Sequence, residues 1–395
     1  MRSRTRHLYI FSLAFVFLSC GGNKNNEQFI SQHPNYIVNC DLDRSNVITN
    51  LSQVCDSIAI IPLDFNSDLI GIVDKLCSDS TGIYIVSNSI LYHFNWNGEQ
   101  SYSIKRIGRS SSDYLELSDF CVSDNHIAIA DIIGQKILLF NKLNGVFHKT
   151  INVDYYPENI EFLNNDTLAI KCSGSEGARL RTIDINSGKI IDTFFEFEQL
   201  FTEPVVQPFI KLGDRVHYKI PFYNDYYSIS VNGKLEKSLS FDFGKYNFDI
   251  TGLDEVSFFG TTMLFDTKGS AKILDVYNTD SLYAISLQCP SVSEDAQYLM
   301  FVDTKSDECY YFDSDTYIDD VLFYDHTILP ILFNSYNGCF IGVIYPDLWV
   351  NTFNSITDKR KQTELYSTAL DYYNCFSNNQ NPLIVQYYFK LEEEN

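Results

Sequence analysis

Short apolar or alternating runs of about five to eight residues fill the chain from about Leu51 onward, with Gly, Asn, Asp and Ser between them. Runs of this length predict β-strands joined by tight turns. Four turn glycines, each preceded by Asn or Ser, recur at spacings of 47, 43 and 45 residues. These turns are Asn97-Gly98, Asn144-Gly145, Ser187-Gly188 and Asn232-Gly233. A period near 45 residues with four strands per unit predicts the blades of a β-propeller.

Phasing the strands on these turns gives five complete repeats and one incomplete repeat. The complete repeats span 72–107, 120–153, 159–197, 208–243 and 271–317. The sixth supplies strands over 328–333, 339–345 and 383–390 and lacks an outer strand, which Ser57–Leu63 can provide from the other end of the chain. A ring needs this closure, because an open sheet edge pairs with other chains. We therefore expect an all-β six-bladed propeller closed by an N-terminal strand; the alternative is a pair of β-sandwiches.

The N-terminus has the features of a bacterial export signal. Basic residues precede an apolar run from Leu8 to Leu18, which is too short to span a bilayer permanently. The run ends in Leu-Ser-Cys-Gly, which resembles a lipobox, in which Cys20 becomes the diacylated N-terminus after cleavage. We expect a signal peptide over 1–19, a lipidated Cys20 with a flexible tether over 20–50, and a propeller over 51–395. The acyl chains would anchor the protein to a membrane without crossing it.

Composition limits the partners and the redox chemistry. The chain has 51 acidic and 29 basic residues and a net charge of −22, so a phosphate backbone would be repelled and nucleic acid is excluded as a partner. A hydrophobic content of 45% is too high for a disordered chain. Nine cysteines follow Cys20 without a CxxC pair, and most lie in apolar runs. We expect mainly free, buried thiols rather than a disulfide scaffold.

Several stretches of the chain resemble one family. They are IAIIPLDFNSDLIGIVDKL (58–76), LYHFNWNGE (91–99), IKRIG (104–108), DYLELSDF (113–120), QKILLF (135–140), YYPENIEFL (155–163), YNDYYSI (223–229), FDFGKY (241–246) and NPLIVQYYFK (381–390). Together they resemble the six-bladed β-propeller lipoproteins of Bacteroidetes, which are related to NHL-type and TolB-like propellers. The segment RSSS (109–112) departs from the Gly/Pro-rich turn of that family. The resemblance implies the fold and the lipid anchor, and it implies no catalytic activity.

The strand phase predicts which face of the propeller binds a ligand. Connections between second and third strands share a face with the connections between blades, and the long segments 109–119, 244–270, 288–297 and 346–382 all belong to this set. Long loops on a rigid scaffold commonly bind ligands. Within the last segment we expect one helical insertion, over Ser355–Phe376. The candidate binding residues of this long-loop face are Arg106, Arg109, Tyr114, Asp131, Arg179, Tyr223, Asp225, Tyr345 and Trp349.

These candidates have a functional and a structural interpretation. The aromatic side chains could stack on sugar rings or on peptide side chains, and the arginines could pair with carboxylates. Alternatively, the aromatic residues belong to the blade core and the charged residues are simply solvated.

The sequence contains none of the common catalytic motifs. HExxH, GxSxG, the phosphate-binding glycine loop and the dinucleotide fingerprint are all missing. An acidic cluster lacks the register of a calcium loop, so solvated turns explain it better; it comprises Asp303, Asp307, Glu308, Asp313, Asp315, Asp319 and Asp320. Among the histidines, His326 is the one expected near the channel. We therefore predict no catalytic residue and no metal ligand.

These observations favour a monomeric binding or scaffold module of the bacterial cell envelope, anchored to the outer membrane on its periplasmic or cell-surface side. Its ligand would be a protein, a peptide or a glycan bound at the long-loop face, without a cofactor. The alternative is a hydrolase or lyase at the propeller channel that uses carboxylates or Ca²⁺.

Overall fold

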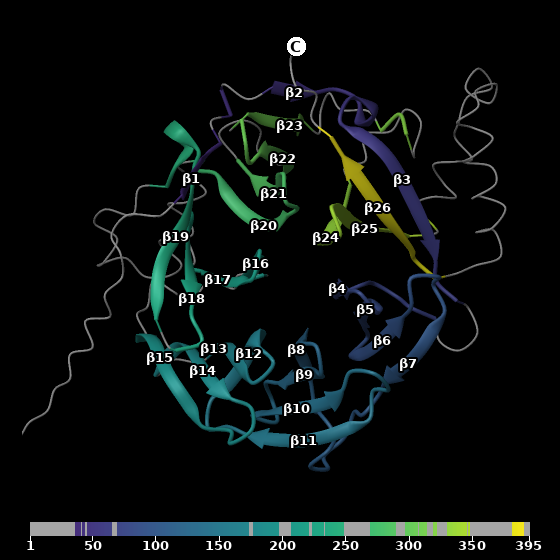
Figure 1. Cartoon of the computed structure of the whole chain (residues 1–395), viewed down its shortest axis with the longest axis vertical. Helices are drawn as coiled ribbons and strands as arrows, with labels where there is room; N and C mark the ends of the chain where they lie inside the picture. The colour runs from purple at the N-terminus through teal and green to yellow at the C-terminus, as the bar shows by residue number, and fades with distance from the viewer. Residues whose placement is uncertain are drawn as a thin grey trace, which may run out of the picture.

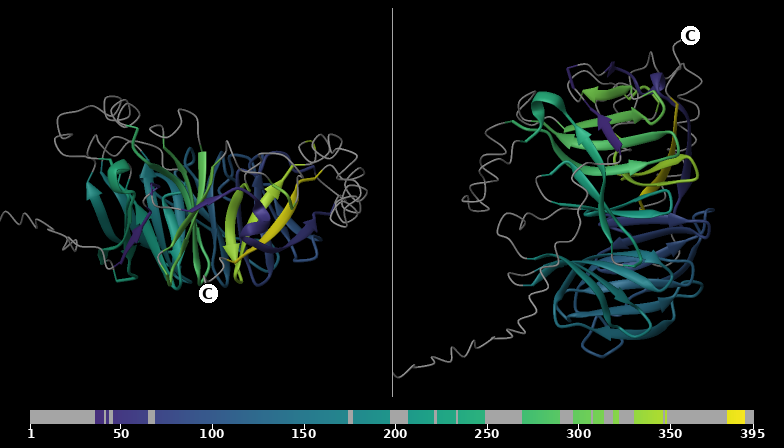
Figure 2. Two further views of the ribbon diagram at one scale, coloured as in Figure 1. Left: turned by 90° about the horizontal axis from the view of Figure 1, so that it is seen from above. Right: turned by 60° about the vertical axis from the view of Figure 1, so that its left-hand side comes forward.

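The computed structural model describes residues 36–390 apart from residues 41, 44–45, 65–68, 174–176, 197–206, 221–222, 233, 249–268, 290–296, 307, 314–318, 322–329, 346 and 348–380. The elements with described bounds are strands β1 to β26 and two short 3₁₀ helices, η1 (Leu51–Gln53) and η3 (Gly244–Tyr246). The strands form six sheets arranged as a ring (Figure 1). Seen from the side, the sheets stand next to one another as blades whose strands run between two faces (Figure 2). The expected all-β six-bladed propeller is confirmed, and the alternative of two β-sandwiches is wrong.

Blades 1 to 5 each contain four consecutive antiparallel strands, with the first strand next to the channel and the fourth outside. Blade 1 comprises β4 (Lys75–Asp79), β5 (Gly82–Ser87), β6 (Ile90–Phe94) and β7 (Gln100–Ile104). Blade 2 comprises β8 (Leu117–Val122), β9 (His126–Asp131), β10 (Lys136–Asn141) and β11 (Phe147–Asn152). Blade 3 comprises β12 (Tyr156–Asn164), β13 (Thr167–Ser173), β14 (Ala178–Asp184) and β15 (Ile190–Glu196). Blade 4 comprises β16 (Phe209–Leu212), β17 (Arg215–Lys219), β18 (Asp225–Ile229) and β19 (Leu235–Asp242), and blade 5 comprises β20 (Lys272–Asn278), β21 (Leu282–Gln288), β22 (Gln297–Asp303) and β23 (Cys309–Asp313).

Blade 6 joins the two ends of the chain, as the sequence predicts. It contains β24 (Leu332–Tyr336), β25 (Cys339–Ile344), β26 (Leu383–Phe389) and, as its outer strand, β3 (Cys55–Pro62). Strands β26 and β3 are antiparallel, and Leu383 pairs with Pro62 while Tyr387 pairs with Ile58. The ring is therefore held shut by backbone hydrogen bonds between its first and last parts.

Two further strands lie where the sequence predicts only a flexible tether. Strand β1 (Tyr36–Asn39) adds in parallel to the outer edge of β19, and β2 (Asn46–Ile48) adds in parallel to the outer edge of β23. We call residues 36–48 the N-terminal strap. With β3, the strap covers the outer edges of blades 4, 5 and 6 in succession (Figure 1). The second half of the expected 20–50 tether is thus built into the propeller.

The hydrophobic core is divided among the interfaces between neighbouring blades. The described buried residues form six clusters, and each cluster draws on two adjacent blades. Between blades 1 and 2, for example, Tyr84 and Leu91 pack with Phe120, Ile129 and Phe140. A middle strand contacts a neighbouring blade on each face, which is why β5 and β6 are buried along their whole length and read as continuous apolar runs.

The glycine in the turn between the third and fourth strands of a blade allows that turn to pack closely against the previous blade. Gly98 lies in the turn between β6 and β7, has a φ of +83°, and a Cβ added there would lie 1.9 Å from the carbonyl oxygen of Pro62. The Asp64 N–H donates to the Gly98 oxygen at 2.7 Å. Gly145 takes the equivalent place against the ring of Tyr102 in blade 1. The glycine period in the sequence therefore serves inter-blade packing as well as turn geometry.

The strand order also defines the two faces. The connections β7–β8, β11–β12 and β19–β20, together with those between second and third strands, lie at the long-loop face, as predicted. The helix expected over 355–376 lies outside the described residues, and no α-helix is among the elements with described bounds. Within the described part of the chain, no helix has the length and hydrophobicity required to cross a membrane.

Candidate functional site

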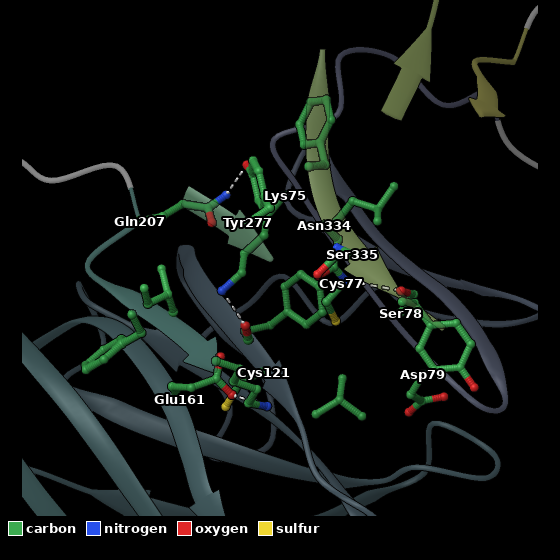
Figure 3. A pocket seen from close by; sticks show the side chains of 18 of the residues that line it. Lys75, Cys77, Ser78, Asp79, Cys121, Glu161, Gln207, Tyr277, Asn334 and Ser335 are labelled. Atoms are coloured by element: carbon green, nitrogen blue, oxygen red, sulfur yellow. Dashed lines mark hydrogen bonds and ion pairs between the residues drawn. The ribbon is translucent and has the colours of Figure 1, made fainter. Parts of the chain in front are cut away.

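The inner strands of the six blades enclose a cavity of about 790 Å³ along the axis of the ring. Residues from β4, β8, β12, β16, β20 and β24 all line it. Its wall extends from Asp74 and Leu117, at the long-loop face, to Gly213 and Gly338, in turns at the opposite face. The cavity therefore follows the full height of the propeller, and we call it the channel. Polar side chains from opposite sides of the ring point into it (Figure 3).

A buried carboxylate ties blades 1, 2 and 3 together at the channel wall. Asp119, on β8, is 4% exposed and accepts a hydrogen bond from Lys75 Nζ at 2.6 Å. Its other oxygen accepts the backbone N–H of Ile160, on β12, at 2.9 Å. Burial by itself would lower the pKa of Lys75, but the charges of Asp119 and Glu161 outweigh it and raise the pKa above its ordinary value. Lys75 is therefore a fixed ammonium at the wall.

A second ion pair joins blades 3 and 4. Lys211 Nζ, on β16, lies 2.7 Å from Glu161 Oε1, on β12. The Lys211 side chain is half exposed, whereas Glu161 is largely covered. Burial acts to lower the pKa of Lys211, and the Glu161 carboxylate more than compensates, so this pKa is raised. The Lys211 side chain lines the channel, so it can contact a molecule there without moving its carboxylate partner.

The other side of the channel carries uncharged polar groups. On blade 6, Asn334 Nδ2 donates to Ser78 Oγ of blade 1 at 3.1 Å. Gln207, which precedes β16, donates to the Tyr277 hydroxyl of blade 5 at 3.2 Å. The channel thus has an ionic half, from blades 1 to 4, and a more neutral half, from blades 5 and 6, in which Asp280 is the one charged residue among the described lining residues.

Two thiols lie in the ionic half of the wall. Burial raises the pKa of Cys77 to about 12, and burial also raises the pKa of Cys121 well above its ordinary value. Both cysteines are therefore protonated thiols at neutral pH and are weak nucleophiles. None of the eight cysteines in the described part of the chain is in a disulfide, which agrees with the expectation of thiols.

Eight of the sequence-predicted binding residues are described; they lie at the long-loop face, and none of the eight lines the channel. Tyr114 is fully buried, and its hydroxyl donates to the backbone oxygen of Ser89 at 2.7 Å. Asp131 is also fully buried and accepts the backbone N–H groups of Leu115 and Gly134 at 2.9 and 2.8 Å. These contacts give Tyr114 and Asp131 a part in shaping the loops of blade 2.

The remaining candidates have varied surroundings. Arg106 pairs with Asp113 at 3.5 Å, and Arg109 is exposed. Asp225 pairs with Lys237 at 2.8 Å. Arg179 is buried and Tyr223 is half-buried, whereas Trp349 lies outside the described residues. The hydroxyl of Tyr345 accepts the backbone N–H of Val73 at 3.0 Å. Two of the candidates contact each other, because the Tyr114 N–H donates to the backbone oxygen of Arg106 at 2.9 Å. The role of the candidates in binding stays a prediction.

The acidic cluster is spread over separate turns. Asp303 accepts the N–H groups of Lys305 and Ser306 at 2.6 and 2.9 Å, as expected of a turn. Asp319 is buried rather than solvated, and Asp320 accepts the backbone N–H of Ser52 at 2.9 Å. Asp307, Asp315 and His326 lie outside the described residues. Among the residues that are described, no three His, Cys, Asp or Glu side chains come together as a set that could hold a metal.

Sequence reasoning missed the channel residues, although a signal for them exists. Lys75, Asp119, Glu161 and Lys211 follow one another at spacings of 44, 42 and 50 residues, close to the blade period. Each is a charged residue in the first strand of a repeat, the strand that lies next to the axis of a propeller. Charges that recur at this position predict a polar channel.

One family model matches nearly the whole described part of the chain. Residues 36–388 match the family described as "Domain of unknown function (DUF4934)". The chain belongs to this family. The matched region begins with the N-terminal strap and ends within β26, so the strap belongs to the family domain together with the six blades. A search of curated proteins found no match.

One solved structure supports the architecture, and a second has a lower similarity. The first is the crystal structure of a Bacteroides fragilis protein described as a "Putative exported protein". It is 18% identical to this chain, with a TM-score of 0.71, and the alignment covers 90% of this chain and 100% of that one. BamB from Moraxella catarrhalis is 9% identical, with a TM-score of 0.40 and coverage of 73% and 87%. At such identities the similarity concerns the fold and carries no function with it.

Proposed function

We propose that this protein is a lipid-anchored binding module of the bacterial cell envelope that takes a small polar ligand into its central channel. The observation that carries the proposal is the channel itself, a cavity of about 790 Å³ lined by side chains of all six inner strands. Its volume lies within the usual range of ligand sites. An axis filled with apolar side chains would have left no such site.

The chemistry of the wall supports binding rather than catalysis. Asp119 and Glu161 are each engaged by a lysine, at 2.6 and 2.7 Å, and neither is arranged as a free acid or base. The thiols of Cys77 and Cys121 are held protonated by burial, which raises the pKa of each. What the wall offers a ligand is a fixed pattern of hydrogen-bond donors and acceptors on rigid strands.

The proposed anchor is consistent with the position of the strap. Cys20 precedes β1 by 16 residues. An extended chain of that length reaches at most about 55 Å, which is enough to hold the propeller near a membrane while leaving it free to turn. We also propose an outer-membrane location and a monomeric state. The long-loop face surrounds one mouth of the channel, so its loops would select what enters.

The proposal is tested by closing the channel. Cys77→Trp places a large ring at the channel wall, and Val146→Trp places the same ring at a residue that is 59% exposed, in the outer turn between β10 and β11. A ligand screen by thermal shift, with oligosaccharides, short peptides and amino acids, should give stabilisation of the wild type and of Val146→Trp. Cys77→Trp should fold, as judged by circular dichroism, and lose that stabilisation. Equal stabilisation of both variants would place the ligand outside the channel and would refute the proposal.

A further inference from the structure

We propose that the channel ligand is a neutral oligosaccharide, an inference that rests on the proposed function. The first argument is electrostatic. Both channel cations, Lys75 and Lys211, are already neutralised by carboxylates at 2.6 and 2.7 Å. The chain as a whole carries a net charge of −22, so an anionic ligand meets repulsion at long range and finds no uncompensated cation among the lining residues of blades 1 to 4.

The second argument is the pattern of hydrogen-bonding groups. A sugar hydroxyl donates one hydrogen bond and accepts others, so it suits a wall where donors and acceptors alternate. The channel wall offers the half-exposed ammonium of Lys211 and the amide of Asn334 as donors. It offers as acceptors the hydroxyl of Ser335 and the amide oxygen of Gln207, since both residues line the channel.

The third argument is an aromatic surface that is already held in place. Tyr336 lines the channel at the end of β24, and the ring of Trp96 stacks on it with centroids 5.1 Å apart and planes 19° apart. Trp96 is itself fixed, because its Nε1 donates to the backbone oxygen of Asp79 at 2.9 Å. A rigid aromatic ring beside polar groups is a surface on which the apolar face of a sugar ring packs at little entropic cost.

The test is a calorimetric titration of the full chain, purified in a detergent without a sugar headgroup. The probes are maltohexaose, cellohexaose, xylohexaose and mannohexaose as neutral oligosaccharides, with tetragalacturonate and tetra-alanine as the anionic and peptide alternatives. We expect at least one neutral oligosaccharide to bind, with a Kd that changes less than about twofold between roughly 50 and roughly 500 mM NaCl, because no net charge is paired.

Two variants locate the bound sugar. Lys211→Met and Asn334→Ala each remove one donor of the wall and should weaken binding by about tenfold, equivalent to about 1.4 kcal/mol. The matched control is Lys245→Met, which removes another exposed lysine in an ion pair, with Asp43 at 2.5 Å, outside the channel lining. This control should leave the Kd unchanged.

The outcomes separate the ligand class from the function. Binding of tetragalacturonate or tetra-alanine that is lost in Cys77→Trp overturns the oligosaccharide and leaves the channel as the binding site. Failure of all four neutral oligosaccharides to bind also overturns the ligand class. Oligosaccharide binding that survives Cys77→Trp, Lys211→Met and Asn334→Ala alike overturns the channel function itself.

Discussion

Substituting Gly98 by alanine probes the contact that locks blade 1 to the closing strand. The added Cβ would lie 1.9 Å from the Pro62 oxygen, a separation that real Cβ atoms essentially never show, so the backbone at the end of β3 must move. The same turn carries the hydrogen bond from the Asp64 N–H to the Gly98 oxygen, at 2.7 Å, which that movement would break. The change therefore acts on ring closure and leaves every other blade untouched.

The chain offers a matched control for the backbone strain. Gly338, in the turn between β24 and β25, has a φ of +80°, close to the +83° of Gly98, and an added Cβ there meets nothing within 4 Å. Alanine at either position costs about 1–2 kcal/mol for the left-handed conformation. Gly98→Ala adds about 1–3 kcal/mol for the steric clash and about 1 kcal/mol for the lost hydrogen bond. We therefore expect Gly98→Ala to be less stable than Gly338→Ala by about 2–4 kcal/mol.

Denaturant unfolding followed by circular dichroism gives the difference in midpoint, provided that the slopes agree. Hydrogen exchange then locates it: amides of β3 and β26 should exchange faster in Gly98→Ala than in Gly338→Ala, and those of β12 to β14 should not differ. Equal midpoints, or faster exchange spread evenly over all blades, would contradict the assigned role of Gly98 in closure.

Two further predictions concern a buried acid and the anchor. Burial raises the pKa of Asp275 from 3.8 to about 6, with Lys219 opposing the shift, so the folded state holds this proton more tightly than the unfolded chain. The associated stability is present below about pH 4 and is lost as the pH rises through 6, by up to about 3 kcal/mol. Asp275→Asn should therefore raise the urea midpoint of unfolding at about pH 7.5 and change it little at about pH 4. Asp113→Asn is the control and should give no such gain. An equal effect of Asp275→Asn at both pH values would contradict the assignment. Cys20→Ser should move the protein from the membrane fraction to the soluble fraction of disrupted cells, whereas Cys309→Ser should stay with the membrane; a Cys20→Ser protein that still sediments would refute lipidation there.

The ring could be predicted because its determinants are local and periodic. Turn glycines recur in four repeats and apolar runs recur in all six. The closing segment Ser57–Leu63 is a strong strand signal in itself, and β3 covers it as far as Pro62. The strap could not be predicted in this way. Strands β1 and β2 have four and three residues, lie among Asn and Asp, and owe their conformation to parallel pairing with β19 and β23 far along the chain.

The site was harder to predict than the fold, for a related reason. Alternation within β9 shows that Asp131 has a preferred side, but not that the backbone N–H groups of Leu115 and Gly134 satisfy its carboxylate. Nor does the sequence show that Tyr114, in the β7–β8 connection, donates to the Ser89 oxygen in a turn of blade 1. Conversely, Lys75 and Asp119 read as ordinary polar positions of two strands. The two residues form an ion pair only because the ring places blade 1 beside blade 2. Lys75 Nζ then lies 2.6 Å from Asp119 Oδ1, although 44 residues of sequence separate them.

The strap and β3 make the fold depend on an order of events during synthesis and export. The segments that leave the ribosome first find their places only beside strands that are made much later, since β3 has to wait for β26 and β1 has to wait for β19. Until its partner has been made, each of these early strands has an unpaired edge, and blade 6 stays open until β26 arrives. Such edges are prone to pair with neighbouring molecules. A chain cut short before Leu383 is therefore a candidate for degradation or aggregation rather than for partial activity, and this protein matures as a whole or not at all.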